Sequence, residues 1–310
     1  MLQKMRVFCV TCGLIALGLG CVGAHDAAAG ELPSLQPYFT QLQLPAGRAE
    51  LSNGFDKTAN GWGGYSTAVV ALTGPLHVDG WRVKLSGGYA SYHYKSRSAY
   101  CQLSAEEKKQ RTGTNFGAIC NDIAGNPPEG EERDALAAEL AAAGLELEGD
   151  QIYAVTPHLG TRYDAVIAPG YQFTLGAVIM KAYLGLGYEL HQVTPPDPAK
   201  PLSGGYWGAQ AGLETWVPLG EDFWISGDAS YFTGTNAHAA SMKMGYKAQP
   251  WLSLGPEFST YGNVDDTSGR AGAFLRLDAL GVETTLAGGL SGTYKDDPGA
   301  YGSASVYMKF

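Results

Sequence analysis

The chain has 310 residues, enough for one large domain or two ordinary ones. Its formal net charge of −9 at pH 7 argues against a nucleic-acid partner, because phosphate groups would be repelled. Only 16% of its residues are charged, whereas it contains 43 glycines and 18 tyrosines. This balance is typical neither of a helical membrane protein nor of a cytosolic enzyme.

Residues 1–24 predict a secretory signal peptide, because two basic residues precede an apolar run that ends in small residues. Cleavage after Ala24, or as late as Ala29, leaves a mature chain that begins near His25 or Gly30. The alternative is a lipoprotein acylated at Cys21. Both readings place the protein outside the cytoplasm.

Cys101 and Cys120 are the two cysteines beyond the signal peptide. In an oxidising compartment they are expected to form a disulfide with each other, and two free thiols are the alternative. Their spacing predicts no metal site, and no cofactor is indicated.

Beyond the signal peptide, segments of about ten residues alternate apolar and polar side chains and are separated by Gly, Pro, Asn and Asp. Such segments are typical of strands with two different environments on their two faces. We count twelve, at 48–57, 62–73, 79–94, 162–174, 178–191, 205–217, 222–233, 239–248, 251–262, 268–279, 281–294 and 299–310.

The connections between these segments alternate between short and long, as in outer-membrane barrels. If the last strand ends in the periplasm, the tight turn at Leu280-Gly281 lies inside and the "NVDDTS" connection lies outside. Continuing back along the chain, the alternation places the 95–161 insertion outside. Within it, Ser104 and Glu107 form a helix capping box, and "EERDALAAELAAAG" predicts a short helix. The insertion either folds over the pore mouth or is a solvated loop.

The fold class predicted for 30–310 is an all-β antiparallel transmembrane barrel of about twelve strands. A secreted β-sandwich is the rival fold, because it also needs alternating strands. The barrel is favoured because one face of nearly every strand carries charges, while aromatic residues gather near strand ends on the other. Phe310 supports it too, since outer-membrane barrels typically end in an aromatic residue that assembly machinery reads.

Catalytic motifs were sought on these strands. A Ser–His pair needs its base within hydrogen-bond reach of the nucleophile, which in one strand favours residues two apart, and no His-x-Ser occurs. Motifs of the G-x-S-x-G and H-E-x-x-H types are lacking as well. The sequence therefore predicts no enzyme and no metal site.

Candidate lumen or path residues are instead expected on the charged face. They are Arg82, Lys84, Lys181, Tyr183, Glu189, Glu214, Glu257, Arg270 and Arg276. They either pair with one another across strands or line a substrate path. A second option uses aromatic faces, which suit the apolar faces of sugar rings. The lumen-side aromatic residues are Tyr92, Tyr94, Tyr183, Tyr206, Trp216, Trp224, Tyr301 and Tyr307.

The stretches "GWRVKLSGGYASYHY" (80–94), "SLGPEFSTYGN" (253–263), "GRAGAFLRL" (269–277) and "GAYGSASVYMKF" (299–310) resemble the BcsS family of cellulose-biosynthesis-associated outer-membrane proteins. "APGYQFTLG" (168–176) and "GAQAGLETWVPLG" (208–220) fit the same pattern. The resemblance implies a barrel in the Gram-negative outer membrane that serves cellulose synthesis, export or surface retention. It brings no catalytic residues.

The implied partners are outer-membrane lipids, the barrel assembly machinery, and cellulose or its synthase and export components. Two other functions remain open. A small-solute porin predicts an open lumen, and a lipid-modifying enzyme requires an acid–base or Ser/His constellation near the outer rim.

Overall fold

The computed structural model describes residues 47–112, 120, 123, 129–197, 202–264, 266–293 and 299–310. The predicted signal peptide, residues 1–24, lies outside these residues, as does the alternative acylation site Cys21. No helix among the described residues is both long and apolar enough to cross a bilayer.

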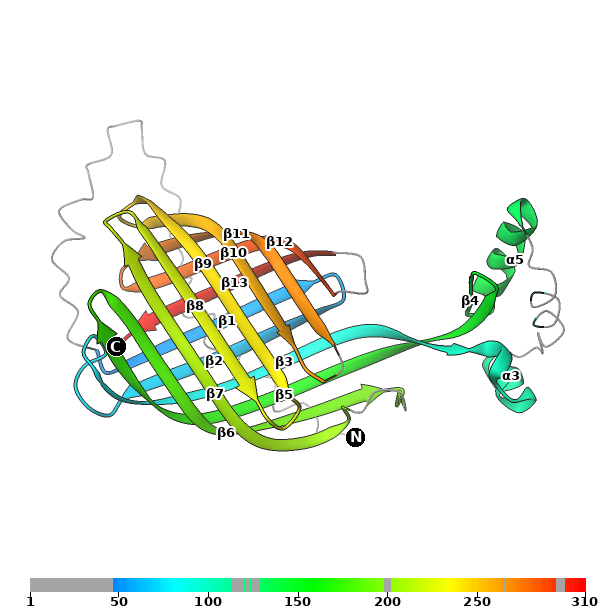
Figure 1. The fold of residues 1–310 in the computed structure, drawn as a ribbon, viewed down its shortest axis with the longest axis horizontal. Coiled ribbons are helices and arrows are strands. Elements are labelled where there is room, and N and C mark those ends of the chain that lie inside the picture. Colours follow the sequence, from blue (N-terminus) through cyan, green and yellow to red (C-terminus); the bar gives the residue numbers. More distant parts are fainter. Residues whose placement is uncertain are drawn as a thin grey trace, which may run out of the picture. The chain divides into compact units, whose positions relative to one another are not determined.

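Twelve antiparallel strands form one closed barrel (Figure 1). Each strand pairs with its neighbour along the chain, and β1 pairs with β13 to close the ring. The strands are β1 (Ala49–Thr58), β2 (Gly61–Ala71), β3 (Gly80–Ala99), β5 (Gln151–Leu175), β6 (Val178–Thr194), β7 (Gly204–Leu219), β8 (Phe223–Phe232), β9 (Ala237–Gln249), β10 (Leu252–Gly262), β11 (Thr267–Ala279), β12 (Val282–Thr293) and β13 (Gly299–Lys309). The predicted all-β barrel and its count of twelve strands are confirmed.

The two ends of the barrel differ in their connections. Both Ala49 and Phe310 lie at one end, which we call the terminal end; there the backbone N–H of Ala49 donates to the Phe310 carbonyl (3.1 Å) and that of Phe310 to the Ala49 carbonyl (2.8 Å). The long chain segment between β3 and β5 leaves from the other end, which we call the insertion end. The seam between the first and last strands is thus hydrogen-bonded to its final residue.

The 95–161 insertion is more regular than predicted. Strands β3 and β5 continue to pair as far as Ala99 and Tyr153, whereas the pairing of β5 with β6 stops at Leu159. Beyond that point the two strands form a ribbon, and β4 (Leu145–Glu148) adds a hairpin to β5. The sequence did not indicate the extensions of β3 and β5, because their pairing joins segments more than fifty residues apart.

A small folded head completes the insertion. It contains η1 (Tyr100–Gln102), α3 (Ala105–Thr112) and α5 (Gly130–Ala142), and the hydrophobic side chains of Tyr100, Leu140 and Ile152 are buried in its core. The predicted Cys101–Cys120 disulfide is confirmed. The Ser104 backbone N–H and hydroxyl both donate to Glu107, as expected of a capping box.

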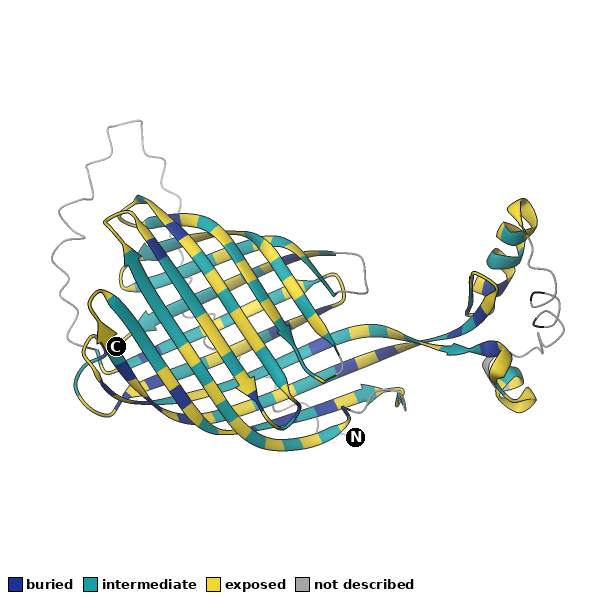
Figure 2. Ribbon diagram, viewed as in Figure 1, coloured by how far each residue is buried: buried dark blue, intermediate teal, exposed yellow. Residues whose placement is uncertain are grey.

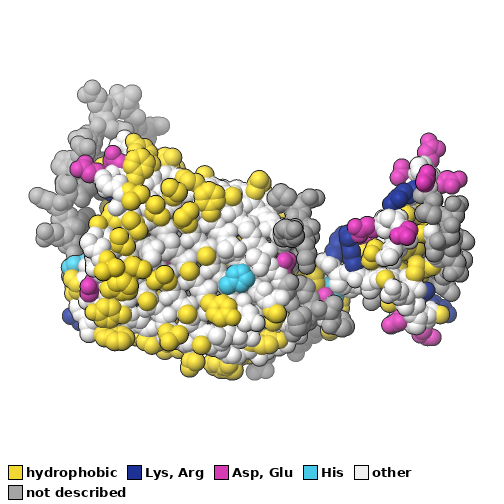
Figure 3. Space-filling model, viewed as in Figure 1, with side chains coloured by type: hydrophobic (Ala, Val, Ile, Leu, Met, Phe, Trp, Pro, Cys, Tyr) yellow, Lys and Arg dark blue, Asp and Glu magenta, His cyan; other side chains and the backbone are white. Residues whose placement is uncertain are grey.

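The faces of the barrel strands alternate in exposure and chemistry (Figure 2). Large apolar residues such as Leu184, Leu186 and Trp207 are exposed on the outer face, and hydrophobic side chains cover much of the wall seen in Figure 3. Outward-facing rings also contact one another from strand to strand, for example Tyr89 and Tyr163 with centroids 4.9 Å apart. An exposed apolar belt of this kind fits a hydrocarbon surrounding rather than water.

Candidate functional site: the barrel lumen

The nine candidate residues occupy the interior side of the barrel. Six of them line one cavity of about 1120 Å³: Lys84, Lys181, Tyr183, Glu189, Glu214 and Arg270. The other three, Arg82, Glu257 and Arg276, are engaged in interior contacts outside the cavity lining. These side chains lie on the lumen face of their strands, and their roles have to be derived from their contacts.

The cavity opens toward the insertion end. Its lining includes Asn60, Asn263, Asp266 and Thr293, which lie in or beside the connections at that end. Between these and the deeper residues the wall carries small polar side chains, including those of Ser86, Ser230, Ser241, Ser259 and Ser268. The half of the lumen toward the insertion end is consequently wide.

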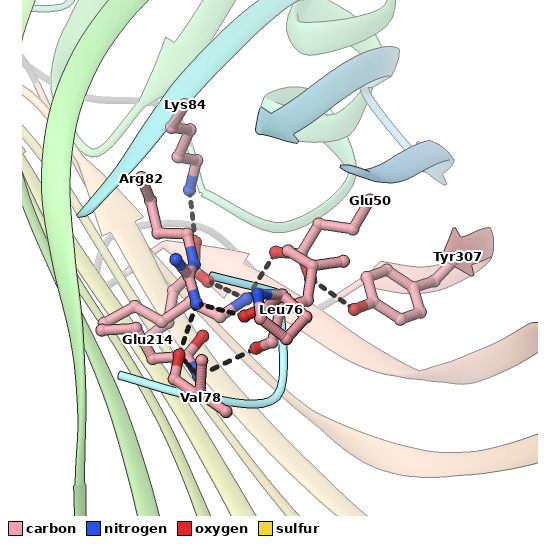
Figure 4. A network of polar contacts seen from close by, with 10 residues as sticks. Glu50, Leu76, Val78, Arg82, Lys84, Glu214 and Tyr307 are labelled. Atoms are coloured by element: carbon pink, nitrogen blue, oxygen red, sulfur yellow. Dashed lines mark hydrogen bonds and ion pairs between the residues drawn. The ribbon is translucent and has the colours of Figure 1, made fainter. Parts of the chain in front are cut away.

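An ion-pair network forms the floor of the cavity (Figure 4). Lys181 pairs with both Glu50 and Glu214 (3.6 Å to the latter), and Lys84 pairs with Glu214 (2.6 Å). The Tyr307 hydroxyl donates to Glu50 (2.5 Å). Since β1 and β6 are separated by three strands in the sheet order, the Lys181–Glu50 pair reaches across the lumen instead of along its wall.

An aromatic layer fills another part of the lumen toward the terminal end. Trp216 and Trp224 stack with centroids 4.4 Å apart, and the Arg276 guanidinium lies 5.2 and 5.4 Å from the two rings. Arg276 is also paired with Asp278 (2.9 Å) and Glu283 (3.0 Å). Such cation–π contacts are strongest where water is excluded, as here.

The connection between β2 and β3 is tied to the interior of the terminal end. Arg82 is fully buried, and Gln172 donates to the Leu76 carbonyl (2.9 Å). The Arg82 guanidinium donates to four carbonyls, those of Thr73, Pro75, Val78 and Trp81. Figure 4 shows Arg82 directed at this turn. Of the two roles left open for the candidate lumen or path residues, the contacts of Arg82 are those of a structural anchor.

A second group of interior pairs lies on the β10 to β1 side. Arg270 pairs with Asp56 (2.7 Å) and its guanidinium lies over the rings of Tyr261 (4.7 Å) and Tyr301 (5.2 Å). The Tyr301 hydroxyl in turn donates to Glu257 (2.6 Å). These contacts hold long side chains against the wall.

On the opposite wall Glu189 is buried and accepts a hydrogen bond from the Thr235 hydroxyl (2.6 Å), with His191 at 3.3 Å. Beside it, Arg162 pairs with Asp164 (3.3 Å), and this pair is more exposed to the cavity. Among the described residues no cluster could hold a metal ion.

The cellulose biosynthesis protein BcsS family matches residues 130–310 of the chain. The chain belongs to this family. Membership gives it a role in cellulose biosynthesis. The matched residues extend from α5 to the last strand, so residues 80–94, which also carried the resemblance seen in the sequence, precede them.

Solved barrels resemble the fold at low sequence identity. They include the KdgM porin (7% identity, 84% of this chain and 99% of that one, TM-score 0.38). Others are the COG4313 outer membrane channel from Pseudomonas putida F1 (11%, 86% and 97%, TM-score 0.42) and the β domain of the Bordetella autotransporter BrkA (9%, 86% and 100%, TM-score 0.44). These similarities carry no argument about ligand or mechanism. No curated protein matches the chain significantly.

The barrel also holds a Ser–His contact that was not expected from the sequence motifs. Ser96 on β3 lies 2.7 Å from Nε2 of His158 on β5, and His158 Nδ1 lies 2.8 Å from the Pro195 carbonyl. In the tautomer that satisfies both contacts, Nδ1–H donates to Pro195 and the Ser96 hydroxyl donates to Nε2. A Ser–His pair within one strand has a sequence signature, whereas no local signal links positions 62 residues apart.

This pair has the first contact of a nucleophile–base arrangement, but neither residue lines the cavity. His158 is buried beneath the connection that follows β6, and it stacks on Tyr94 with centroids 4.9 Å apart. Its contacts therefore fasten that connection to the ribbon formed by β3 and β5.

Proposed function

We propose that the protein is a non-enzymatic outer-membrane barrel that binds cellulose chains at the cell surface and retains them there. The division of the lumen carries this proposal: a wide cavity at the insertion end stops at a floor of cross-lumen ion pairs, with an aromatic layer and an anchored turn toward the terminal end. A polymer can enter such a cavity, but it cannot pass through the filled half.

The proposed location follows from the outer surface and the connections. The exposed apolar belt suits a bilayer, and short connections at the terminal end suit the periplasmic side of such a barrel. In this orientation the insertion end, with its disulfide-linked head, faces the cell exterior. A disulfide is compatible with that oxidising surrounding. Outer-membrane lipids and the barrel assembly machinery, reading Phe310, are the proposed partners in assembly.

Export of cellulose through the barrel is the second candidate, and it requires the filled half to open. A small-solute porin would need the same opening. Lipid modification would need a reacting group at the rim, and the Ser96–His158 contact is already occupied in fastening a connection. Surface retention is favoured because it needs no rearrangement.

A deletion strain separates these functions. Retention predicts that total cellulose is unchanged while dye-binding cellulose moves from the cell surface to the medium. Export predicts less extracellular cellulose and accumulation inside the envelope. The intact gene restores the wild-type distribution, whereas a version that lacks the last strand, β13, does not. Unchanged amount and location of cellulose would refute both proposals and leave the porin, tested by single-channel conductance.

A further inference from the structure

The interior aromatic residues expected to contact sugar are mostly engaged with protein groups. Trp216 and Trp224 stack on each other beneath Arg276. Lys84 lies over the Tyr183 ring, and Tyr94 stacks on His158. A ring that is covered on its faces cannot stack on a ligand, so these side chains serve the packing of the lumen.

Tyr65 is different, and it is not among the aromatic residues expected to contact sugar. It lies on β2 on the same face as Thr67 and Val69 and lines the cavity with them, yet its side chain is 46% exposed. Within the described part of the chain, other aromatic residues of comparable exposure, such as Tyr163 and Trp207, lie on the outer face. Tyr65 therefore presents a large ring surface to the cavity.

The backbone beneath Tyr65 explains how the ring lies. Its register partner on β1 is Gly54, and a Cβ at Gly54 would come within 2.3 Å of the Tyr65 ring. The ring thus extends over a position without a side chain, which lets it lie close to the wall. The exposed part of the ring borders the cavity, which Tyr65 lines.

Polar groups for hydroxyl recognition lie in the same row of the sheet. The partner of Tyr65 on β3 is Gly88, whose own partner on β5 is Asp164. A Cβ at Gly88 would be 2.8 Å from the Asp164 carboxylate, so this carboxylate leans over the glycine toward Tyr65. Arg162, paired with Asp164 at 3.3 Å, adds hydrogen-bond donors.

We propose that Tyr65 is a stacking platform for a pyranose ring of an uncharged glucan, with Asp164 and Arg162 binding hydroxyl groups at the ring edge. The apolar C–H face of a sugar ring complements an aromatic face, and a carboxylate–guanidinium pair supplies acceptors and donors together. This assignment rests on the proposed surface-binding function and names the site that performs it.

The charge of the cavity disfavours an anionic ligand. Its lining has four Lys and Arg side chains, Lys84, Arg162, Lys181 and Arg270, against seven carboxylates, Glu50, Asp56, Asp164, Glu189, Glu214, Asp228 and Asp266. This excess of negative charge would repel an anionic glycan, whereas it would not repel a neutral glucan.

The test is a calorimetric titration of the purified full-length barrel with cellohexaose. Tyr65→Ala is expected to weaken binding by about tenfold or more, whereas Tyr65→Phe keeps the ring and stays within about twofold of wild type. Tyr163→Ala is the matched control, because Tyr163 is equally exposed (46%) but on the outer face. Oligogalacturonate, the charged comparison ligand, is expected to bind more weakly than cellohexaose.

Gly54→Ala provides a second variant that retains Tyr65 but displaces its ring, and it is expected to weaken binding as well. If wild type binds cellohexaose and both Tyr65→Ala and Gly54→Ala bind equally well, the platform is wrong while surface binding stands. No binding by wild type would overturn both. Tighter binding of oligogalacturonate would overturn the choice of an uncharged ligand.

Discussion

The two halves of the lumen are built on the same strands but differ in content. On β8, Ser230 faces the cavity toward the insertion end, whereas Trp224 packs toward the terminal end. On β11 the corresponding residues are Ser268 and Arg276. Alternation decides only that a side chain points inward. The size of that side chain, and whether it reaches a partner on a distant strand, decides whether the lumen is open or filled.

The difference between the two halves of the lumen has a functional consequence. Cross-lumen contacts, such as Lys181 with Glu50, join strands that are not neighbours in the sheet, so they stiffen the terminal half. The half toward the insertion end keeps most of its charged pairs along the wall and leaves its centre to solvent or ligand. A rigid, closed base beneath an accessible cavity suits binding better than transport.

The most damaging single change to the filled half is expected at Trp224. This side chain is 3% exposed, stacks on Trp216, contacts Phe274 and donates to Ser253. Trp224→Ala should lower the free energy of unfolding by about 3–5 kcal/mol, because it leaves a large cavity. Urea unfolding in lipid vesicles measures this. Trp207→Ala, on the outer face, is the control, and an equally small loss for both variants would mean that the terminal half is not a packed layer.

Loss of the disulfide in the head shows whether the stability of the head is independent of that of the barrel. Cys101→Ser removes a bond that closes a loop between positions 19 residues apart. We expect the head to lose about 3 kcal/mol of local stability, in the chain-entropy estimate for a loop of this size. Hydrogen exchange should accelerate around Leu140 and Ile152 and remain unchanged in the barrel strands. Faster exchange in both would indicate that the barrel depends on the head.

A double-mutant cycle at the ion-pair floor measures how much a cross-lumen pair stabilises the terminal half. Lys181→Met removes a mostly buried cation and leaves Glu50 with Tyr307 as a partner. The expected loss of unfolding free energy is about 2–3 kcal/mol, at or below the range for fully buried pairs. Adding Glu50→Leu should recover much of it, because no unpaired charge remains. Additive losses would show that the two residues do not act as a pair.

The smallest effect is expected in the open half. Arg162 is 41% exposed and its pair with Asp164 is screened by solvent in the cavity. Arg162→Ala should therefore lower the unfolding free energy by less than about 1 kcal/mol. The same urea measurement tests this. A loss equal to that of Lys181→Met would show that ion pairs in the two halves contribute equally to the free energy of unfolding.

Much of the fold could be predicted because the barrel pattern is local. Arg82, Lys84 and Lys181 face inward as expected, since side-chain direction follows from alternation along a single strand. Partners across the lumen depend on how strands are staggered around the ring, which no single strand encodes. The lumen face of Arg82 could therefore be predicted, but its hydrogen bonds to a turn could not.

The same limit explains the missed platform. Tyr65 stands in "GWGGYSTAVV", where its neighbours along the chain give no sign of the ring's position. Its exposure depends on Gly54 and Gly88, which belong to different strands and become its neighbours only through the sheet register. A search for inward aromatic residues flanked by glycine in both predicted partner strands would have found it.

The hydrogen bonds between Ala49 and Phe310 have a consequence for biogenesis. Because β1 pairs with β13, closure of the ring joins two strands that lie about 250 residues apart in the sequence, and contacts of such long range form slowly. A chain that stops early leaves β1 with an unpaired edge, and such edges recruit other strands. Pairing of β13 with β1 thus converts a sheet with two open edges into a closed barrel.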